Sequence, residues 1–148
     1  MDEKKYDCLK LSSQLCFPLY ACARETIKLY TPHLEKIGLT YTQYITMMVL
    51  WEQNSLTAKE LGRLLYLDSG TLTPLLKKLE AKSLITRKRS ETDERNLIIT
   101  LTEEGENLKD QAMLIPYEIE KCINMDRDEI LQLYRMLHRL LLCVEEQD

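Results

Sequence analysis

Glycine and proline are scarce in this sequence, with four of each among 148 residues, which leaves little room for long loops or linkers. No apolar run approaches the roughly 18–20 residues that a membrane span requires. The first ten residues are charged and lack the apolar stretch of a secretory signal. We therefore expect one folded chain in the cytoplasm, with no membrane partner.

The cysteines and histidines form no pattern of metal ligands. The two histidines, His33 and His138, stand alone, and no Cys-x-x-Cys pair occurs among the five cysteines, Cys8, Cys16, Cys22, Cys122 and Cys143. An odd count with irregular spacing argues against a secreted disulfide scaffold and against zinc, so we expect no metal and no other cofactor. Any one of these cysteines could simply be a small buried hydrophobic residue.

The net charge of −4 conceals one basic block. Residues 74–90 carry six basic side chains and one acidic one, a local charge of +5, whereas residues 103–148 carry −7. Basic charge concentrated in two adjacent elements suits a surface that faces phosphates, with acidic ends that keep the rest of the chain off DNA. An ordinary solvated surface would explain the block nearly as well, so charge alone leaves both interpretations open.

Capping residues mark most of the expected helices. Capping boxes begin at Thr40 and Thr57, and an aspartate version begins at Asp126. Thr31 before Pro32 indicates a further helix start. We expect helices at about 9–29, 32–37, 41–53, 58–65, 69–82, 103–122 and 127–145, with a β-hairpin formed by 84–88 and 97–101. Pro18 lies inside the first of these helices, so either that helix is kinked or it begins later.

Two short helices followed by a basic hairpin are typical of a winged helix-turn-helix, so the expected fold is mainly α with a small β-hairpin wing. The second helix begins with small hydrogen-bonding residues that can approach bases and phosphates closely. A plain surface helix could begin in the same way, but together with the hairpin and the basic block it favours double-stranded DNA as the partner. The expected DNA contacts are Asp68, Ser69, Thr71, Thr73, Lys77, Lys78, Arg87 and Arg89.

Both ends of the chain have the pattern of partner-binding helices. Residues 127–145 place Ile130, Leu133, Leu137, Leu140 and Val144 at alternating spacings of three and four. We therefore assign 1–39 and 103–148 to an obligate homodimer interface, and 40–102 to the DNA-binding lobe. The alternative is that these helices pack on their own domain. A pseudo-palindromic operator favours the dimer, because its two half-sites mirror two-fold symmetry.

Several motifs resemble a known family. LDSGTLTPLLKKLE, followed by RKRSETDERNLIITLTEEG with its Asp93-x-Arg95 wing signature, resembles the DNA-binding lobe of the MarR family. QLCFPLYACARE, Tyr30 and LTYTQYITMMVLWE are similar, more narrowly, to the organic-hydroperoxide-sensing repressors called OhrR. The resemblance extends from about residue 11 to residue 145.

The resemblance implies that Cys16 is the peroxide-reactive cysteine and that Tyr30 and Tyr41 donate hydrogen bonds to its sulfur. It also places Arg95 on the part of the wing that enters the minor groove. The residue types suit this chemistry, because a thiolate attacks the O–O bond and leaves a sulfenic acid. Two phenols can stabilise that anion without adding a full charge. The alternative for both tyrosines is a purely structural place at an interface.

The sulfenic acid could be resolved in two ways. The resemblance implies that Cys122 of the other subunit, matching the resolving cysteine of the two-cysteine subgroup, forms a disulfide with Cys16. The alternative is a mixed disulfide with a low-molecular-weight thiol. If 9–29 is one helix, Cys22 lies about 9 Å and Cys8 about 12 Å along its axis from Cys16. Both exceed the Cα separation of about 7 Å that a disulfide allows.

These features predict a transcriptional repressor, not an enzyme, that senses organic hydroperoxides through Cys16 and then releases its operator. Two other classes remain open. A MarR-type regulator could bind a small phenolic ligand without cysteine chemistry. A thiol-dependent peroxidase could use the same cysteine, but it would have no need of the basic hairpin.

Overall fold

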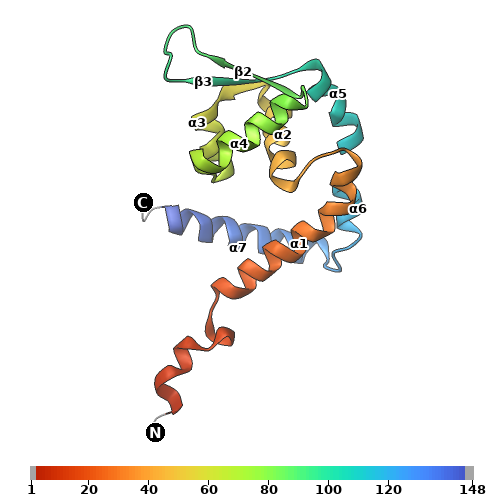
Figure 1. Cartoon of the computed structure of the whole chain (residues 1–148). Coiled ribbons are helices and arrows are strands. Elements are labelled where there is room, and N and C mark those ends of the chain that lie inside the picture. Colours follow the sequence, from red (N-terminus) through yellow and green to blue (C-terminus); the bar gives the residue numbers. More distant parts are fainter. Residues whose placement is uncertain (1–2, 146–148) are drawn as a thin grey trace. The chain divides into compact units, whose positions relative to one another are not determined.

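The computed structural model describes residues 3–145, which divide into two compact units between Pro116 and Tyr117. The first unit holds two short 3-10 helices, five complete α-helices, the sheet and the start of α6 (Figure 1). Its elements are η1 (Glu3–Leu9), η2 (Leu11–Ser13), α1 (Cys16–Lys36), α2 (Tyr41–Gln53), β1 (Ser55–Thr57), α3 (Ala58–Leu65), α4 (Ser69–Ala81), β2 (Ile85–Arg89), β3 (Leu97–Leu101) and α5 (Glu103–Ala112). The second unit holds the rest of α6 (Ile115–Glu120) and α7 (Arg127–Glu145).

One continuous helix, α1, replaces the two helices expected at 9–29 and 32–37, so that expectation was wrong at both boundaries. The Thr31 hydroxyl does not cap a new helix; it donates back to the carbonyl of Ile27 at 3.4 Å. Pro32 removes only the bond to the Lys28 carbonyl, and both residues are exposed, so that water can replace the lost donor. The helix ends before Gly38, whose φ of +67° is the left-handed conformation that glycine adopts at little cost.

The start of α1 explains Pro18. Because α1 begins at Cys16, Pro18 lies in the first turn, where backbone N–H groups have no helical acceptor, and it breaks no hydrogen bond. The late start also means that no single helix joins Cys8 to Cys16. The helix-based distance of about 12 Å between these two residues therefore no longer applies. Cys22 remains within α1, about 9 Å along the axis from Cys16, and still lies beyond disulfide reach in one chain.

The three helices expected directly before the hairpin are confirmed. Helices expected at 41–53 and 58–65 are present with those bounds, and the third, α4, ends one residue earlier than expected. The capping boxes at Thr40 and Thr57 both form. Each threonine side chain accepts from the backbone N–H three residues later, and the side chain of that later residue accepts from the threonine N–H. The apolar faces of the three helices meet in a core that includes Met47, Leu50, Leu61, Leu72, Leu76 and Leu79.

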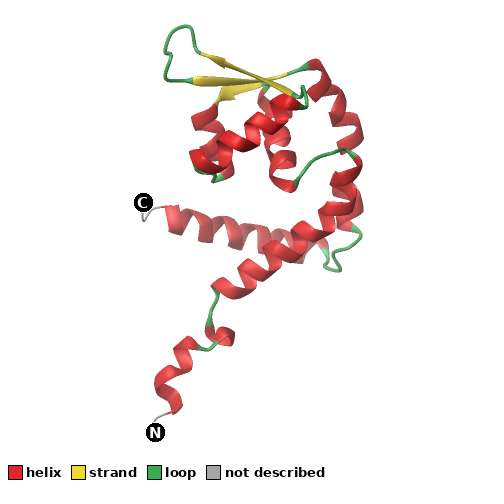
Figure 2. Ribbon diagram, viewed as in Figure 1, coloured by secondary structure: helices red, strands yellow, loops and turns green. Residues whose placement is uncertain are grey.

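The expected hairpin is also confirmed, with its first strand shifted by one residue to Ile85–Arg89. We call β2, β3 and their connecting loop the wing (Figure 2). Its strands pair antiparallel with Arg87 opposite Ile99. A third strand, β1, was missed. It pairs with the other edge of β3, with Leu56 opposite Ile99, in the order β1-β3-β2. Three residues are too few for an alternating pattern, and only pairing with a distant strand defines them as a strand.

The helix expected at 103–122 is interrupted, forming α5 and α6. Pro116 explains the break, because it has no N–H for the carbonyl of Ala112 and its ring crowds that carbonyl. The helix expected at 127–145 is confirmed as α7, and its aspartate cap forms in both directions between Asp126 and Glu129. Within residues 3–145, no helix combines the length and the apolarity of a membrane span.

Candidate redox site and nucleic-acid interface

Tyr30 and Tyr41, the phenol pair, pack against each other edge to face with ring centroids 5.0 Å apart. The loop around Gly38 brings them together, because it folds the end of α1 back beside the start of α2. The buried Leu34 and Leu39 anchor this turn, and the Leu39 N–H donates to the Leu34 carbonyl at 3.0 Å. The structure thus brings the two predicted tyrosines into one half-buried cluster.

Burial, and secondarily the neighbouring Tyr41, raises the pKa of Tyr30. Burial also raises the pKa of Tyr44, whose ring centroid lies 6.0 Å from that of Tyr30. A raised pKa keeps a phenol protonated at neutral pH, so its O–H remains a hydrogen-bond donor. Such a donor can stabilise an anion that approaches the exposed side of the pair.

Cys16, the first residue of α1, is a free and exposed thiol, with the exposed apolar residues Leu15 and Phe17 beside it. Tyr30 follows fourteen residues later on the same helix, which corresponds to about 21 Å along the axis. A hydrogen bond spans about 3 Å. Within one chain, therefore, the structure does not bring the predicted reactive sulfur to the phenol pair.

All five cysteines are exposed and free in the single chain, so none of them is a buried hydrophobic residue there. Cys122 follows α6 in the second unit, and its thiol donates to the Glu118 carbonyl at 3.5 Å. Among residues 3–145, no cluster of histidine, cysteine, aspartate and glutamate has the arrangement of a metal site.

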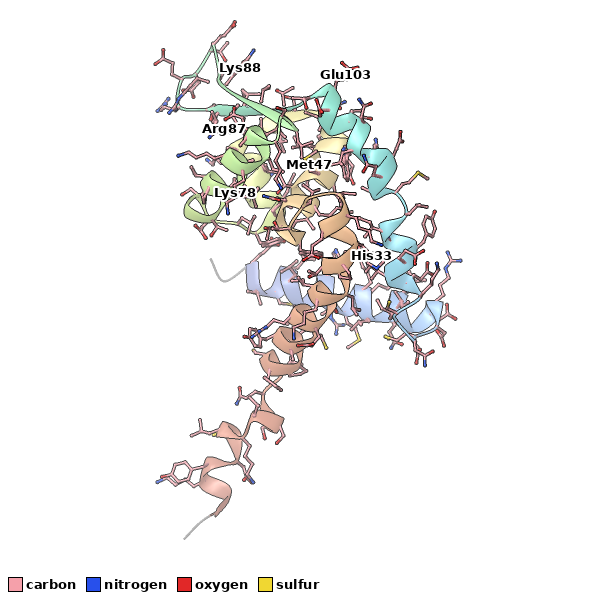
Figure 3. The ribbon with its side chains drawn as sticks, turned by 45° about the vertical axis from the view of Figure 1, so that its right-hand side comes forward. His33, Met47, Lys78, Arg87, Lys88 and Glu103 are labelled. Atoms are coloured by element: carbon pink, nitrogen blue, oxygen red, sulfur yellow. The ribbon has the colours of Figure 1, made fainter. Side chains whose placement is uncertain are left out.

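The start of α4 is held by Asp68. One of its carboxylate oxygens accepts from the Thr71 N–H and the other from the Thr71 hydroxyl, each at 2.9 Å. These bonds lower the pKa of Asp68 and occupy both residues as a helix cap. The other predicted contacts on α4 are exposed to solvent: Ser69, Thr73, Lys77 and Lys78. Figure 3 labels Lys78 among them.

Arg87 on β2 is bound to Glu80 on α4 (Figure 3 labels the arginine). Its Nε and Nη2 donate to the Glu80 Oε2 at 2.9 and 2.7 Å, and its backbone N–H donates to Oε1 at 3.1 Å. The guanidinium lowers the pKa of Glu80, and only 20% of the Arg87 side chain is exposed. This pair fixes the wing to α4. Sequence analysis did not predict this role of Glu80. The one feature that could have indicated it is that Glu80 is the only acidic residue in the basic block of residues 74–90.

Asp93 organises the tip of the wing. Its Oδ1 accepts from the Arg95 N–H at 3.1 Å and from the Arg95 Nε at 3.2 Å, while Oδ2 accepts from the Asn96 side chain at 3.3 Å. Arg89 donates to the carbonyl of Glu94 at 2.8 Å. The Arg95 side chain is nevertheless 92% exposed, so it can reach a neighbouring molecule.

Residues 28–112 match the family of transcriptional regulators described as SarA/Rot. The organic hydroperoxide resistance transcriptional regulator of Bacillus subtilis is 48% identical over 146 residues, 99% of each chain. The chain belongs to the SarA/Rot family of transcriptional regulators. The MarR-type winged helix-turn-helix is confirmed by a mutant MarR of Escherichia coli, solved in complex with operator DNA. It has the same fold at a TM-score of 0.79 and 22% identity, over 86% of this chain and 93% of that one.

Among the solved structures, AbfR of Staphylococcus epidermidis is 33% identical with a TM-score of 0.78, over 98% of this chain and 99% of that one. AbfR has also been solved reduced and bound to DNA, overoxidized and bound to DNA, and in a disulfide-formed state. This protein is thus similar, over nearly its full length, to a protein solved in several oxidation states.

The two wing arginines should respond differently to substitution. Arg95→Ala should weaken DNA binding and lower the slope of log affinity against log salt by roughly one unit, because an exposed guanidinium can neutralise one phosphate. Arg87→Ala should lower affinity and the melting temperature while leaving the slope nearly unchanged, because its partner is Glu80. Fluorescence anisotropy over a salt series measures both slopes. An unchanged slope for Arg95→Ala would place this side chain away from the DNA backbone and grooves.

Proposed function

We propose that this protein is a homodimeric transcriptional repressor that senses organic hydroperoxides by oxidation of Cys16 and then releases its operator. It would act in the cytoplasm as a regulator and not as an enzyme. The observation that carries the proposal is the phenol pair: two adjacent phenols, one with a raised pKa, positioned to donate to an anion. The Bacillus subtilis relative, 48% identical over 99% of both chains, is named for organic hydroperoxide resistance.

The redox site forms between two subunits. Cys16 and Tyr30 lie about 21 Å apart on one helix, so the thiol can meet only the phenols of another chain. Two α1 helices related by a two-fold axis and running in opposite directions place Cys16 of one chain beside Tyr30 and Tyr41 of the partner subunit. The symmetry creates this contact twice, giving two sites per dimer.

The chemistry at each site begins with the Cys16 thiolate, which the partner's phenol O–H groups stabilise. The sulfur attacks one peroxide oxygen, the O–O bond breaks, and an alcohol leaves after taking up a proton. Cys16 becomes a neutral sulfenic acid. The phenol O–H groups then no longer donate to an anionic sulfur. Each step changes the hydrogen bonds that hold α1 against the partner's α1–α2 turn.

The surfaces at the two ends of the chain support the dimer. No residue of α7 is buried, although the helix carries a long apolar stripe. Segments 1–39 and 103–148 would bury such surface between subunits, leaving 40–102 as the DNA-binding lobe. Exposed members of that stripe include Ile130, Leu133, Tyr134, Leu137, Leu141 and Val144.

Two such lobes would read a pseudo-palindromic duplex, with α4 in the major groove and the wing in the minor groove. Ser69, Thr73, Lys77 and Lys78 would contact DNA from α4, and Arg89 and Arg95 from the wing. Asp68, Thr71 and Arg87 would contribute at the same surface while holding α4 and the wing in position.

We further propose that Cys122 of the partner subunit resolves the sulfenic acid. Its thiol attacks the Cys16 sulfur, water leaves, and a disulfide joins the two chains. The free and exposed state of the Cys122 thiol supports this step, as does the existence of a disulfide-formed state of AbfR. The competing route is a mixed disulfide between Cys16 and a low-molecular-weight thiol.

Cys16→Ser tests the sensor. The variant should bind the DNA upstream of its own gene as tightly as the wild type, yet stay bound after cumene hydroperoxide, because serine cannot form the sulfenic acid. A gel shift with and without the peroxide measures both states, with Cys143→Ser as the matched cysteine control. Release of Cys16→Ser by the peroxide would refute the assignment. Release of the wild type only by salicylate-like compounds would favour a sensor of phenolic ligands.

Cys122→Ser tests the resolving step. After peroxide treatment the wild type should give a covalent dimer on a non-reducing gel, and Cys122→Ser should lose that band, whereas Cys143→Ser should keep it. Intact mass then identifies what Cys16 carries in each sample. A band that persists in Cys122→Ser shows that another thiol resolves Cys16.

A further inference from the structure

Trp51, near the end of α2, forms hydrogen bonds to α5 through both its side chain and its backbone. Its indole N–H donates to the carbonyl of Gly105 at 2.8 Å, and its own carbonyl accepts from the Lys109 ammonium at 3.4 Å. Among the described residues, both hydrogen bonds between α2 and α5 therefore involve Trp51. Trp51 is also the single tryptophan of the chain.

Gly105 is packed directly against the base of the wing. A Cβ at this position would lie 2.2 Å from the Leu84 carbonyl oxygen and 2.7 Å from a Leu101 methyl, so only glycine allows this approach. Thr102 adds two bonds: its N–H donates to Leu84 at 3.1 Å and its hydroxyl to Ser83 at 2.6 Å. The start of α5 thus contacts the residues just before β2 and the last residue of β3.

On its other side Trp51 packs against the tyrosine cluster. Its ring centroid lies 6.3 Å from that of Tyr44, in an edge-to-face arrangement. Tyr44 is buried and lies 6.0 Å from Tyr30, which in turn contacts Tyr41. Tyr44 and Trp51 are seven residues apart, close to two helical turns, so they project from the same face of α2. We call these four rings the aromatic row.

We propose that Trp51 is the positioning residue that couples the phenol pair to the wing. This inference rests on the proposed redox function and adds its route. When oxidation of the facing sulfur displaces Tyr30 or Tyr41, the close-packed row transmits the displacement through Tyr44 to Trp51. The indole hydrogen bond transmits this displacement to Gly105. The close contact of Gly105 with Leu84 then transmits it to β2. Because binding linkage is reciprocal, DNA held by the wing must alter the surroundings of Trp51 in turn.

Fluorescence tests the wing half of this route without any peroxide. Since Trp51 is the only tryptophan, emission excited at the red edge of its absorption reports on this residue alone. Titrating reduced wild-type protein with operator DNA should shift the emission, and cumene hydroperoxide should shift it in the DNA-free protein. Cys16→Ser should keep the first change and lose the second. Emission that is unaffected by DNA would overturn the coupling.

Trp51→Phe tests the whole route, because phenylalanine keeps a ring in the row but cannot donate to Gly105. We expect its reduced form to bind operator DNA within about threefold of the wild type. Mass analysis should show Cys16 oxidised at the wild-type rate. The affinity ratio between reduced and oxidised protein should fall about tenfold. Met48→Leu, an exposed α2 position outside the row, is the matched control.

The outcomes separate the two proposals. An unchanged affinity ratio in Trp51→Phe, with the wild type responding to peroxide, would refute the role of Trp51 and leave the sensor intact. If wild-type protein ignores peroxide, the redox function fails, and the DNA-induced emission change alone decides whether Trp51 is linked to the wing. Slower oxidation of Cys16 in Trp51→Phe would also contradict the proposal, because it would place Trp51 in the reaction and not in the transmission.

Discussion

The continuity of α1 determines which groups can meet in this protein. A helix that runs unbroken from Cys16 to Lys36 keeps the thiol and Tyr30 about 21 Å apart. Packing with Tyr41 and Tyr44 holds Tyr30 against α2 of its own chain. Cysteine chemistry that uses these phenols therefore requires two chains. In the proposed mechanism, peroxide sensing therefore depends on dimerisation, and a single chain would keep its DNA-binding surface but have no working sensor.

Close contacts attach the wing to the helices on two sides. The Glu80–Arg87 pair ties β2 to α4, and the close approach of Gly105 to Leu84 ties the wing to α5. Flexible attachment would let each lobe adapt to DNA independently of the other elements. With these contacts the wing follows the helices, and in the proposed mechanism a change at the phenol pair would therefore alter how well two lobes fit one duplex.

Local signals predicted the lobe well and the ends of the chain less well. Thr40 and Thr57 fixed helix starts because capping depends on residues three positions away. Pro32 led to the wrong prediction of a helix boundary. A proline interrupts a helix less when water can bind the carbonyl that loses its donor, here that of the exposed Lys28. Strand β1 and the Glu80–Arg87 pair depend on partners distant in sequence. The assignment of the phenol pair came from family resemblance. The fourteen-residue spacing along one helix separates Cys16 from Tyr30, but no local pattern predicts that Tyr30 meets Tyr41.

The two-chain site can be tested directly with a mixed dimer of one Cys16→Ser chain and one chain carrying Tyr30→Phe and Tyr41→Phe. If the phenols act on the partner's sulfur, this dimer keeps one intact site, and half as many sites as in the wild type should react with cumene hydroperoxide at the wild-type rate. If the phenols acted within their own chain, no intact site would remain. Stopped-flow measurement of sulfenic acid formation that finds no fast-reacting sulfur in the mixed dimer would contradict the account.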